Sequence, residues 1–231
     1  GRKTETAMVR EVSTNYGIRT QFNLPDGTTV WLNSGSRLRF PETFAGHRRE
    51  VYLYGEACFE VSKDASRPFY VNLGEISVKA TGTTFNVSAW PGDNTYETSL
   101  LSGKIDLVKN VSRRQEIVVC RMQPKQHVIF NKAGDRVEVK DESAEEAEMM
   151  VPEADKTAGA KRMEPILPKA VSHNKHTSWI AGKLVFRNDP MEEVIRQLGR
   201  WYNVDIRLRD TILYDFKYTA TFENETLDQV L

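Results

Sequence analysis

The 231-residue sequence has no long apolar run, few cysteines and no excess of charge of either sign. No stretch approaches the roughly 18 consecutive apolar residues of a membrane-spanning helix, and no signal peptide opens the chain. Basic and acidic residues number 32 each, so the formal charge of zero argues against a dedicated nucleic-acid-binding protein. Apolar residues at 39% and charged residues at 28% are a balance that supports a globular core.

The two cysteines, Cys58 and Cys120, are too few for a scaffold built on disulfides. Both lie in apolar runs typical of strands, where cysteine usually serves as a small buried hydrophobic residue. A disulfide between them is the alternative, because the two predicted strands can pair in space. A metal site at either would need histidine or cysteine neighbours, and the sequence suggests none.

Residues 17–140 predict an all-β domain. Apolar residues such as Phe22 and Leu24 alternate with polar ones in short runs, separated by turn signals such as Pro25-Asp26-Gly27. No helical period appears, which excludes a parallel sheet with crossover helices. A sandwich, a barrel and a short β-solenoid all remain open. The recurrent glycines are interpreted as turn formers: Gly27, Gly35, Gly55, Gly82 and Gly103.

Residues 141–176 change character and predict a mobile linker. An acidic run at 141–148 is followed by scattered proline and glycine among basic residues. His173 and His176 are spaced i, i+3 in this linker and are interpreted as solvated surface, whereas His47 and His127 stand alone. The sequence therefore predicts no metal site, no cofactor site and no catalytic residue.

The last region, 177–231, contains an internal repeat. The segment 186–195 (FRNDPMEEVI) matches 222–231 (FENETLDQVL) at an offset of 36 residues. Each copy begins with a β-like run that leads into a helix start, so the unit is strand-helix-strand. The second copy is cut before its closing strand, and the chain has no initiator methionine, so we expect a piece of a longer product.

Local signals define the helix of the first copy. Asp189 is predicted to cap the helix, with Pro190 at its first position and Glu192 completing a capping box. Asn203 fits a left-handed stop, and 204–208 alternates as the next strand. The apolar stripe at helical spacing consists of Val194, Ile195, Leu198 and Trp201.

Several motifs in the β region resemble FecR domains, in order over about 120 residues. They are 24–36 (LPDGTTVWLNSGS), 55–61 (GEACFEV), 67–71 (RPFYV), 78–87 (VKATGTTFNV) and 101–105 (LSGKI). Cys58 departs from the usual aromatic residue at its position, which puts nothing functional in doubt. Residues 179–186 (WIAGKLVF) and 198–203 (LGRWYN) are similar to the C-terminal domain of Bacteroidetes members. That domain is related to the short N-terminal domain of secretins and TonB-dependent transporters.

This resemblance implies a mainly β fold followed by a small α+β domain, and a signalling role. FecR-like proteins cross the inner membrane once and bind an extracytoplasmic-function sigma factor at their cytoplasmic end. Their periplasmic part senses the N-terminal signalling domain of a loaded TonB-dependent outer-membrane transporter. The chain would be that periplasmic part, with 1–16 as an extension after a membrane span outside the sequence. The implied protein is an anti-sigma factor and not an enzyme.

Such a receiver needs a protein-binding surface and a bistable or cleavable element rather than a catalytic pocket. We expect the 177–231 unit, or an edge of the β-domain, to bind the transporter by accepting a strand. The predicted partner-binding residues are Trp179, Leu184, Phe186, Trp201 and Tyr202.

Three other functions compete with this interpretation. A periplasmic carbohydrate-binding β-domain is the main alternative, since tryptophan can stack on sugars. A hydrolase is weaker, because no serine, histidine and acid arrangement is recognisable. A secretin-like assembly module is suggested only by the duplicated unit. The tryptophans are Trp31, Trp90, Trp179 and Trp201, for which packing is the simpler role.

Overall fold

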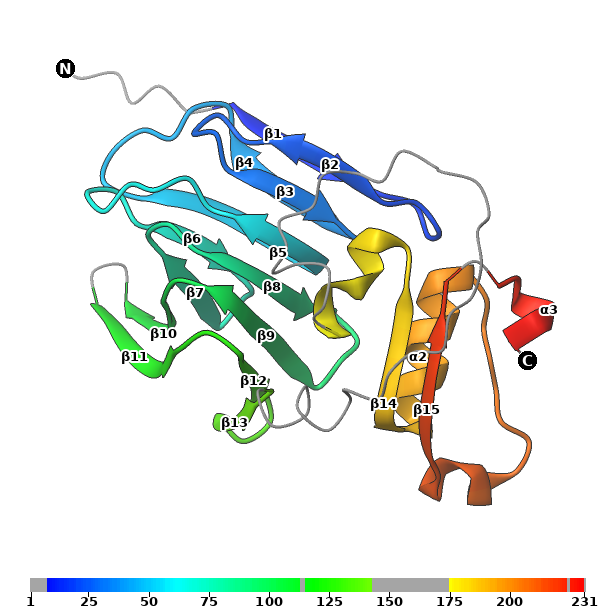
Figure 1. Cartoon of the computed structure of the whole chain (residues 1–231). Helices are drawn as coiled ribbons and strands as arrows, with labels where there is room; N and C mark the ends of the chain where they lie inside the picture. Colours follow the sequence, from blue (N-terminus) through cyan, green and yellow to red (C-terminus); the bar gives the residue numbers. More distant parts are fainter. Residues whose placement is uncertain (1–7, 113–114, 143–174, 224, 231) are drawn as a thin grey trace, which may run out of the picture.

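The computed structural model describes residues 8–112, 115–142, 175–223 and 225–230, which form a β-domain and a smaller C-terminal domain (Figure 1). The mainly β fold with a small α+β region at its end, predicted from the sequence, is confirmed. Most of the predicted linker, including His173, lies outside the described residues. In the described ranges, no helix has the length and apolar character needed to cross a membrane.

The β-domain is built from one large mixed sheet that folds back on itself. Its first strands, β1 to β4, and its last strands, β10 to β13, lie at opposite ends of the domain (Figure 1). The strands are β1 (Val9–Ser13), β2 (Thr20–Asn23), β3 (Thr29–Leu32), β4 (Arg37–Pro41), β5 (Arg49–Glu60), β6 (Phe69–Asn72), β7 (Ile76–Ala80), β8 (Thr84–Ala89), β9 (Thr95–Ser102), β10 (Ile105–Ser112), β11 (Gln115–Met122), β12 (Gln126–Asn131) and β13 (Arg136–Asp141).

Strand β5 belongs to both halves of the sheet. Its first half, from Arg49, pairs with β4 and in parallel with β6, while its second half, 55–60, pairs with β3 and β8. Gly55 lies where the strand passes between the halves, with φ +103°, and an added Cβ would lie 2.4 Å from Oγ of Ser36. Only glycine adopts this conformation at such a close contact. Gly55 is therefore a strand residue, and its interpretation as a turn former is wrong.

The two halves enclose a continuous apolar core. The predicted alternation along the strands places every second side chain in this core. The aromatic rings of Phe59, Phe69 and Phe85 meet at the centre of the core. Phe59 and Phe85 stack with centroids 5.4 Å apart, and Phe59 lies 5.9 Å from Phe69. Burial of these rings joins the two halves of the sheet and supplies much of the stability of the domain.

A buried ion pair lies at the edge of this core. Nη1 of Arg49 donates to Oδ2 of Asp26 over 2.6 Å, and their side chains are 1% and 5% exposed. Arg49 also donates from Nη1 to the Ser62 carbonyl over 2.8 Å and from Nε to the Arg67 carbonyl over 2.8 Å. Thr28 donates its backbone N–H and its hydroxyl to Asp26. The turn predicted at Pro25-Asp26-Gly27 is thus tied to β5.

The β-domain begins earlier than the sequence predicts. Residues 1–16 were expected to be an extension, but β1 pairs antiparallel with β4 between Val9 and Ser13. All but one of its residues are exposed, so its sequence carries little apolar alternation. The strand is held by backbone pairing, which leaves no periodic signal in the side chains.

The C-terminal domain contains a two-stranded sheet covered by one helix. Its elements are η1 (Lys175–Ala181), β14 (Leu184–Pro190), α2 (Met191–Tyr202), η2 (Thr211–Asp215), β15 (Lys217–Phe222) and α3 (Leu227–Val230). Leu184 and Phe186 of β14 pack against Val194 and Leu198 of α2. Helices α2 and α3 begin 36 residues apart, which is the predicted repeat offset, and the first strands of the two copies pair antiparallel.

Several local predictions in this domain are wrong. Asp189 does not cap α2, because its carboxylate binds the Lys175 ammonium at 2.5 Å and the Arg187 N–H at 2.8 Å. Pro190 occupies the cap position instead of the first helical position, and because it has no N–H, Glu192 does not complete the predicted capping box. Residues 204–208 form no strand, and Ile206 packs against the core of the C-terminal domain without pairing. The predicted stop is confirmed, because Asn203 is left-handed at φ 57° and ψ 50°.

Candidate functional site

All four tryptophans gather where the two domains meet. Trp31 on β3 and Trp179 on η1 are buried with Cys58 in a small apolar cluster, and Trp201 packs against it. Trp90, just after β8, is 7% exposed at the same junction. Packing between domains is therefore the role of these rings. For the carbohydrate-binding alternative, only Trp201, which is half-buried and lies under the Arg19 guanidinium, offers any surface for stacking on a sugar.

Arg19 connects the β-domain to η1 and α2. Its Nη1 donates to the Trp179 carbonyl over 3.0 Å, and its guanidinium lies 3.8 Å from the centroid of the Trp201 ring. A guanidinium over an indole is the favoured cation–π geometry, worth more when the group is withdrawn from water. The sequence gives no local signal for this contact, since Arg19 and Trp179 are 160 positions apart.

Helix α2 is bound to the β-domain by a second arginine. Arg200 donates from Nη2 to Oδ1 of Asp93 over 2.6 Å, and its guanidinium lies 4.2 Å from the Trp90 ring. The Arg200 carbonyl accepts from the Ser34 hydroxyl at 3.0 Å, and Arg196 lies 3.7 Å from the same aspartate. These polar contacts surround the apolar cluster, as in specific interfaces.

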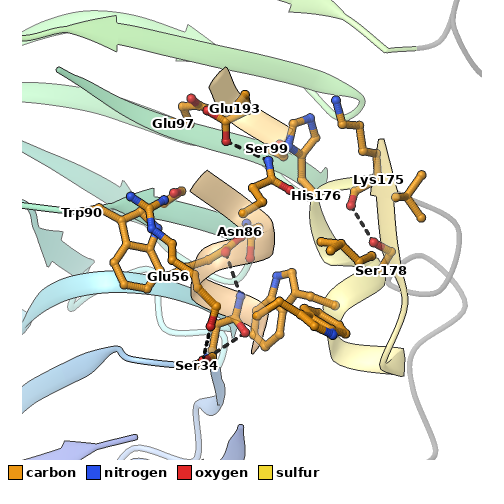
Figure 2. Close-up of a pocket in the computed structure, with 18 of the residues that line it drawn as sticks. Ser34, Glu56, Asn86, Trp90, Glu97, Ser99, Lys175, His176, Ser178 and Glu193 are labelled. Carbon is orange, nitrogen blue, oxygen red and sulfur yellow. Dashed lines mark hydrogen bonds between the residues drawn. The ribbon is translucent and has the colours of Figure 1, made fainter. Parts of the chain in front are cut away.

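A cavity of about 80 Å³ lies between the domains beside these contacts. Figure 2 shows Glu56, Asn86 and Glu97 reaching it from the β-domain, while Lys175 and His176 enter from η1. Its lining is rich in polar and ionisable side chains, unlike the apolar lining typical of drug-like ligand sites. The cavity is therefore suited to water or a small ion.

Glu56 is the carboxyl group of the cavity whose pKa is raised. Burial raises the pKa of Glu56 to about 7, although N–H donors of Asn86 and Asn33 stabilise the charged form. Each amide donates to one carboxylate oxygen over 2.8 Å. Oδ1 of Asn86 is buried without a hydrogen-bond partner. Glu56 is therefore partly protonated near neutral pH.

We expect Glu56→Gln to stabilise the chain at pH 8 by about 2 kcal/mol, and much less at pH 5. The folded pKa lies above the unfolded one, so the stability contributed by the protonated carboxyl is complete below pH 4.5 and is lost as pH rises to about 7. A glutamine side chain does not titrate. Once the Asn86 amide group is flipped by 180°, the glutamine N–H can donate to Oδ1 of Asn86. Urea unfolding of both proteins from pH 5 to 8 tests this, and a constant stability difference would contradict it.

Three ionisable side chains lie together beyond Glu56, although they are far apart in the sequence. The rings of His127 and His176 stack with centroids 4.0 Å apart, and Glu97 lies 3.3 Å from Nε2 of His127. Burial opposes ionisation of Glu97, but the hydrogen bond and charge of His127 lower its pKa to about 2. Burial and His127 lower the pKa of His176. His127 is thus not isolated, and His176 lies at a domain junction.

The five predicted partner-binding residues have different positions. Trp179, Leu184 and Phe186 are buried, the first at the junction and the others in the core of the C-terminal domain. Trp201 and Tyr202 are half-buried, and the Tyr202 hydroxyl donates to the Glu225 carbonyl at 2.7 Å. Only the last two offer surface to a partner in this conformation. Their role in binding stays a prediction.

The two cysteines are free thiols on different parts of the sheet. Cys58 is buried in β5, where burial raises the pKa of its thiol, and Cys120 lies half-buried on β11. Cys58 packs in the junction cluster while Cys120 packs on the β-domain core. The alternative of a disulfide between them is not realised in this structure.

The chain matches two models of related families. Residues 10–106 match the FecR protein family, and residues 183–231 match the family described as FecR, C-terminal. The first match covers β1 to the start of β10, and the second covers the whole C-terminal domain after η1. Among curated proteins, none matches the chain.

Two crystal structures from Parabacteroides distasonis, each described as a "putative anti-sigma factor", are similar over nearly the whole chain. One has a TM-score of 0.74 and 29% identity, covering 97% of this chain and 89% of that one. The other has a TM-score of 0.73 and 30% identity, covering 96% and 88%. Both domains are therefore shared with these proteins. The chain belongs to the FecR family of anti-sigma factors, a regulatory and non-enzymatic family.

Proposed function

We propose that the chain is the periplasmic sensor part of a transmembrane anti-sigma factor on the inner membrane. It receives a signal from the N-terminal signalling domain of a TonB-dependent outer-membrane transporter. Through a cytoplasmic region outside this sequence, it then controls an extracytoplasmic-function sigma factor. Membership of the FecR family supports the anti-sigma part of this proposal, and the surface of the C-terminal domain supports the transporter part.

The observation that carries the docking step is an exposed apolar surface beside a free sheet edge. Among the described residues, β15 pairs only with β14, so one edge of β15 keeps unpaired backbone groups. The η2 surface, which leads into that edge, consists of Ile212, Leu213, Tyr214 and Phe216. Ile212 and Phe216 are 62% and 56% exposed.

Together these features suit binding by strand addition. The edge offers main-chain hydrogen bonds to an incoming strand, and the η2 surface offers apolar contacts beside it. Exposed apolar clusters of this kind mark interaction sites on soluble proteins. The contacts described between the domains come from η1 and α2 and include none of the residues of the η2 surface, so the partner would bind without separating the domains.

Calorimetry with the purified signalling domain of the transporter tests docking. We expect one-to-one binding, weakened about 30-fold by the double substitution Ile212→Asp and Phe216→Asp, because charges would enter the apolar centre of the interface. Ile117→Asp on β11, a residue that is 53% exposed, is the matched control and should leave the affinity unchanged. Absence of binding by the unmodified chain would overturn the proposed docking step.

A further inference from the structure

We propose that Glu97, His127 and His176 form a binding site for a divalent transition metal ion, with Zn²⁺ as the best match, between the two domains. Each residue offers one ligand atom, and these atoms all lie within 4.8 Å of one another. Two imidazoles and one carboxylate are a common ligand set for Zn²⁺. The family membership and the docking proposal make no use of this cluster.

One pair of ligand atoms already has the spacing that a bound ion requires. Zn–N and Zn–O distances of about 2.0–2.1 Å place neighbouring ligands of a tetrahedral ion about 3.4 Å apart. Nε2 of His127 and Oε2 of Glu97 are already 3.3 Å apart. The His176 ring lies parallel to that of His127, with 9° between the planes. Because ligand nitrogens point at the ion in their ring planes, His176 has to rotate about χ2 when the ion binds.

Outer partners fix which ring nitrogens face the ion. The Ser99 hydroxyl lies 2.7 Å from Nδ1 of His127, so Nε2 is the nitrogen directed toward Glu97. Oε1 of Glu142 lies 2.8 Å from Nε2 of His176, so we assign Nδ1 of that ring to the ion. Histidine ligands of metal sites are held in this way by a hydroxyl, carbonyl or carboxylate on the other nitrogen.

The charges of the cluster are also appropriate. Glu97 and Glu142 together balance the two positive charges of the ion. The nearest cations are engaged elsewhere: Lys175 binds Asp189 at 2.5 Å, and Arg196 binds Glu193 and lies 3.7 Å from Asp93. The ligands line the cavity between the domains, which supplies an entry path and space for a water as the fourth ligand.

The site would couple the ion to the arrangement of the domains. Glu97 lies on β9 and His127 on β12, while His176 lies on η1. One ion would therefore hold η1 against the β-domain beside the contacts of Arg19 and Arg200. Because the ion would bind only when η1 lies against the β-domain, it should stabilise that arrangement by RT ln(1 + c/Kd), where c is the concentration of free Zn²⁺.

The test uses the whole 231-residue chain, freed of metal by dialysis against a chelator. Calorimetric titration with ZnCl₂ should show one ion bound per chain, and thermal melting should show a higher Tm with the ion. We expect His176→Gln and, separately, Glu97→Gln to weaken Zn²⁺ binding by about 100-fold, since losing a ligand exceeds the 10–100-fold cost of losing an outer partner. His47→Gln, in an exposed loop, should bind as the unmodified chain does.

Circular dichroism and melting without metal identify any variant that fails to fold, and the second ligand variant then carries the test. Tetrahedral absorption bands with Co²⁺ in place of Zn²⁺ give an independent readout that should disappear in the ligand variants. No binding of Zn²⁺ by the unmodified chain would overturn the proposal. Equal affinity in the unmodified chain and both folded ligand variants would overturn it as well.

Discussion

Asp26→Ala is expected to lower the free energy of unfolding by about 3–5 kcal/mol, because it leaves the Arg49 guanidinium charged and uncompensated in the interior. The two side chains are 1% and 5% exposed, so water cannot replace the lost carboxylate without opening the structure. The two hydrogen bonds that Asp26 accepts from Thr28 are lost as well. Urea unfolding of the unmodified and substituted chains measures the difference.

Two variants separate the buried charge from the turn, and a third, at an exposed ion pair, is the control for burial. Asp26→Asn keeps the shape of the side chain and one acceptor for Thr28. Its decrease in the free energy of unfolding should therefore be smaller and should report mainly the loss of the negative charge. The double substitution Asp26→Ala with Arg49→Met should be no less stable than Asp26→Ala alone, because the uncompensated charge is gone. Glu42→Ala, which removes the exposed pair with Arg10, should cost less than about 1 kcal/mol. A loss for Asp26→Ala as small as that for Glu42→Ala would contradict the argument.

Local sequence patterns predicted the elements of the fold but not the contacts between them. Alternation along the strands and three of the four predicted stripe residues on α2 correctly place the core, because burial of one face leaves a period in the sequence. Ile195 is the exception, since it is half-buried and lies outside the core cluster. The repeat offset predicts where α3 begins, and Asn203 the end of α2. β1 was missed because its pairing depends on backbone groups, which any residue supplies.

The candidate site could not be predicted from the sequence for the same reason. Arg200 and Asp93 are 107 positions apart, and the ring of His127 meets that of His176 only when η1 lies against the β-domain. No spacing rule connects such residues, since their distance is set by domain packing. At Asp189 a local signal was present but misleading. The residue type and spacing are typical of a helix cap, yet the carboxylate binds Lys175 instead. Tertiary contacts thus decide the roles of charged residues at the junction.

Trp179 is expected to be the main apolar contact holding the C-terminal domain against the β-domain. Its side chain is 5% exposed and is enclosed with Trp31 and Cys58. We expect Trp179→Ala to destabilise the junction by about 3–5 kcal/mol, from lost burial and from the cavity left behind. Each 1.4 kcal/mol is a factor of ten, so amides protected through the junction should exchange with deuterium about 100- to 4,000-fold faster.

Graded substitutions make this prediction specific. Nε1 of Trp179 is buried without a hydrogen-bond partner, so Trp179→Phe loses no polar contact and leaves a smaller cavity. Its effect should therefore lie well below that of alanine. Tyr202→Phe, which removes only the hydrogen bond to the Glu225 carbonyl, should leave exchange at the junction unchanged. The β-domain keeps its own core, so the interior amides of β5 and β8 should stay protected in every variant. If Trp179→Ala instead accelerated amide exchange equally in both domains, the two domains would unfold as one unit, which contradicts the prediction.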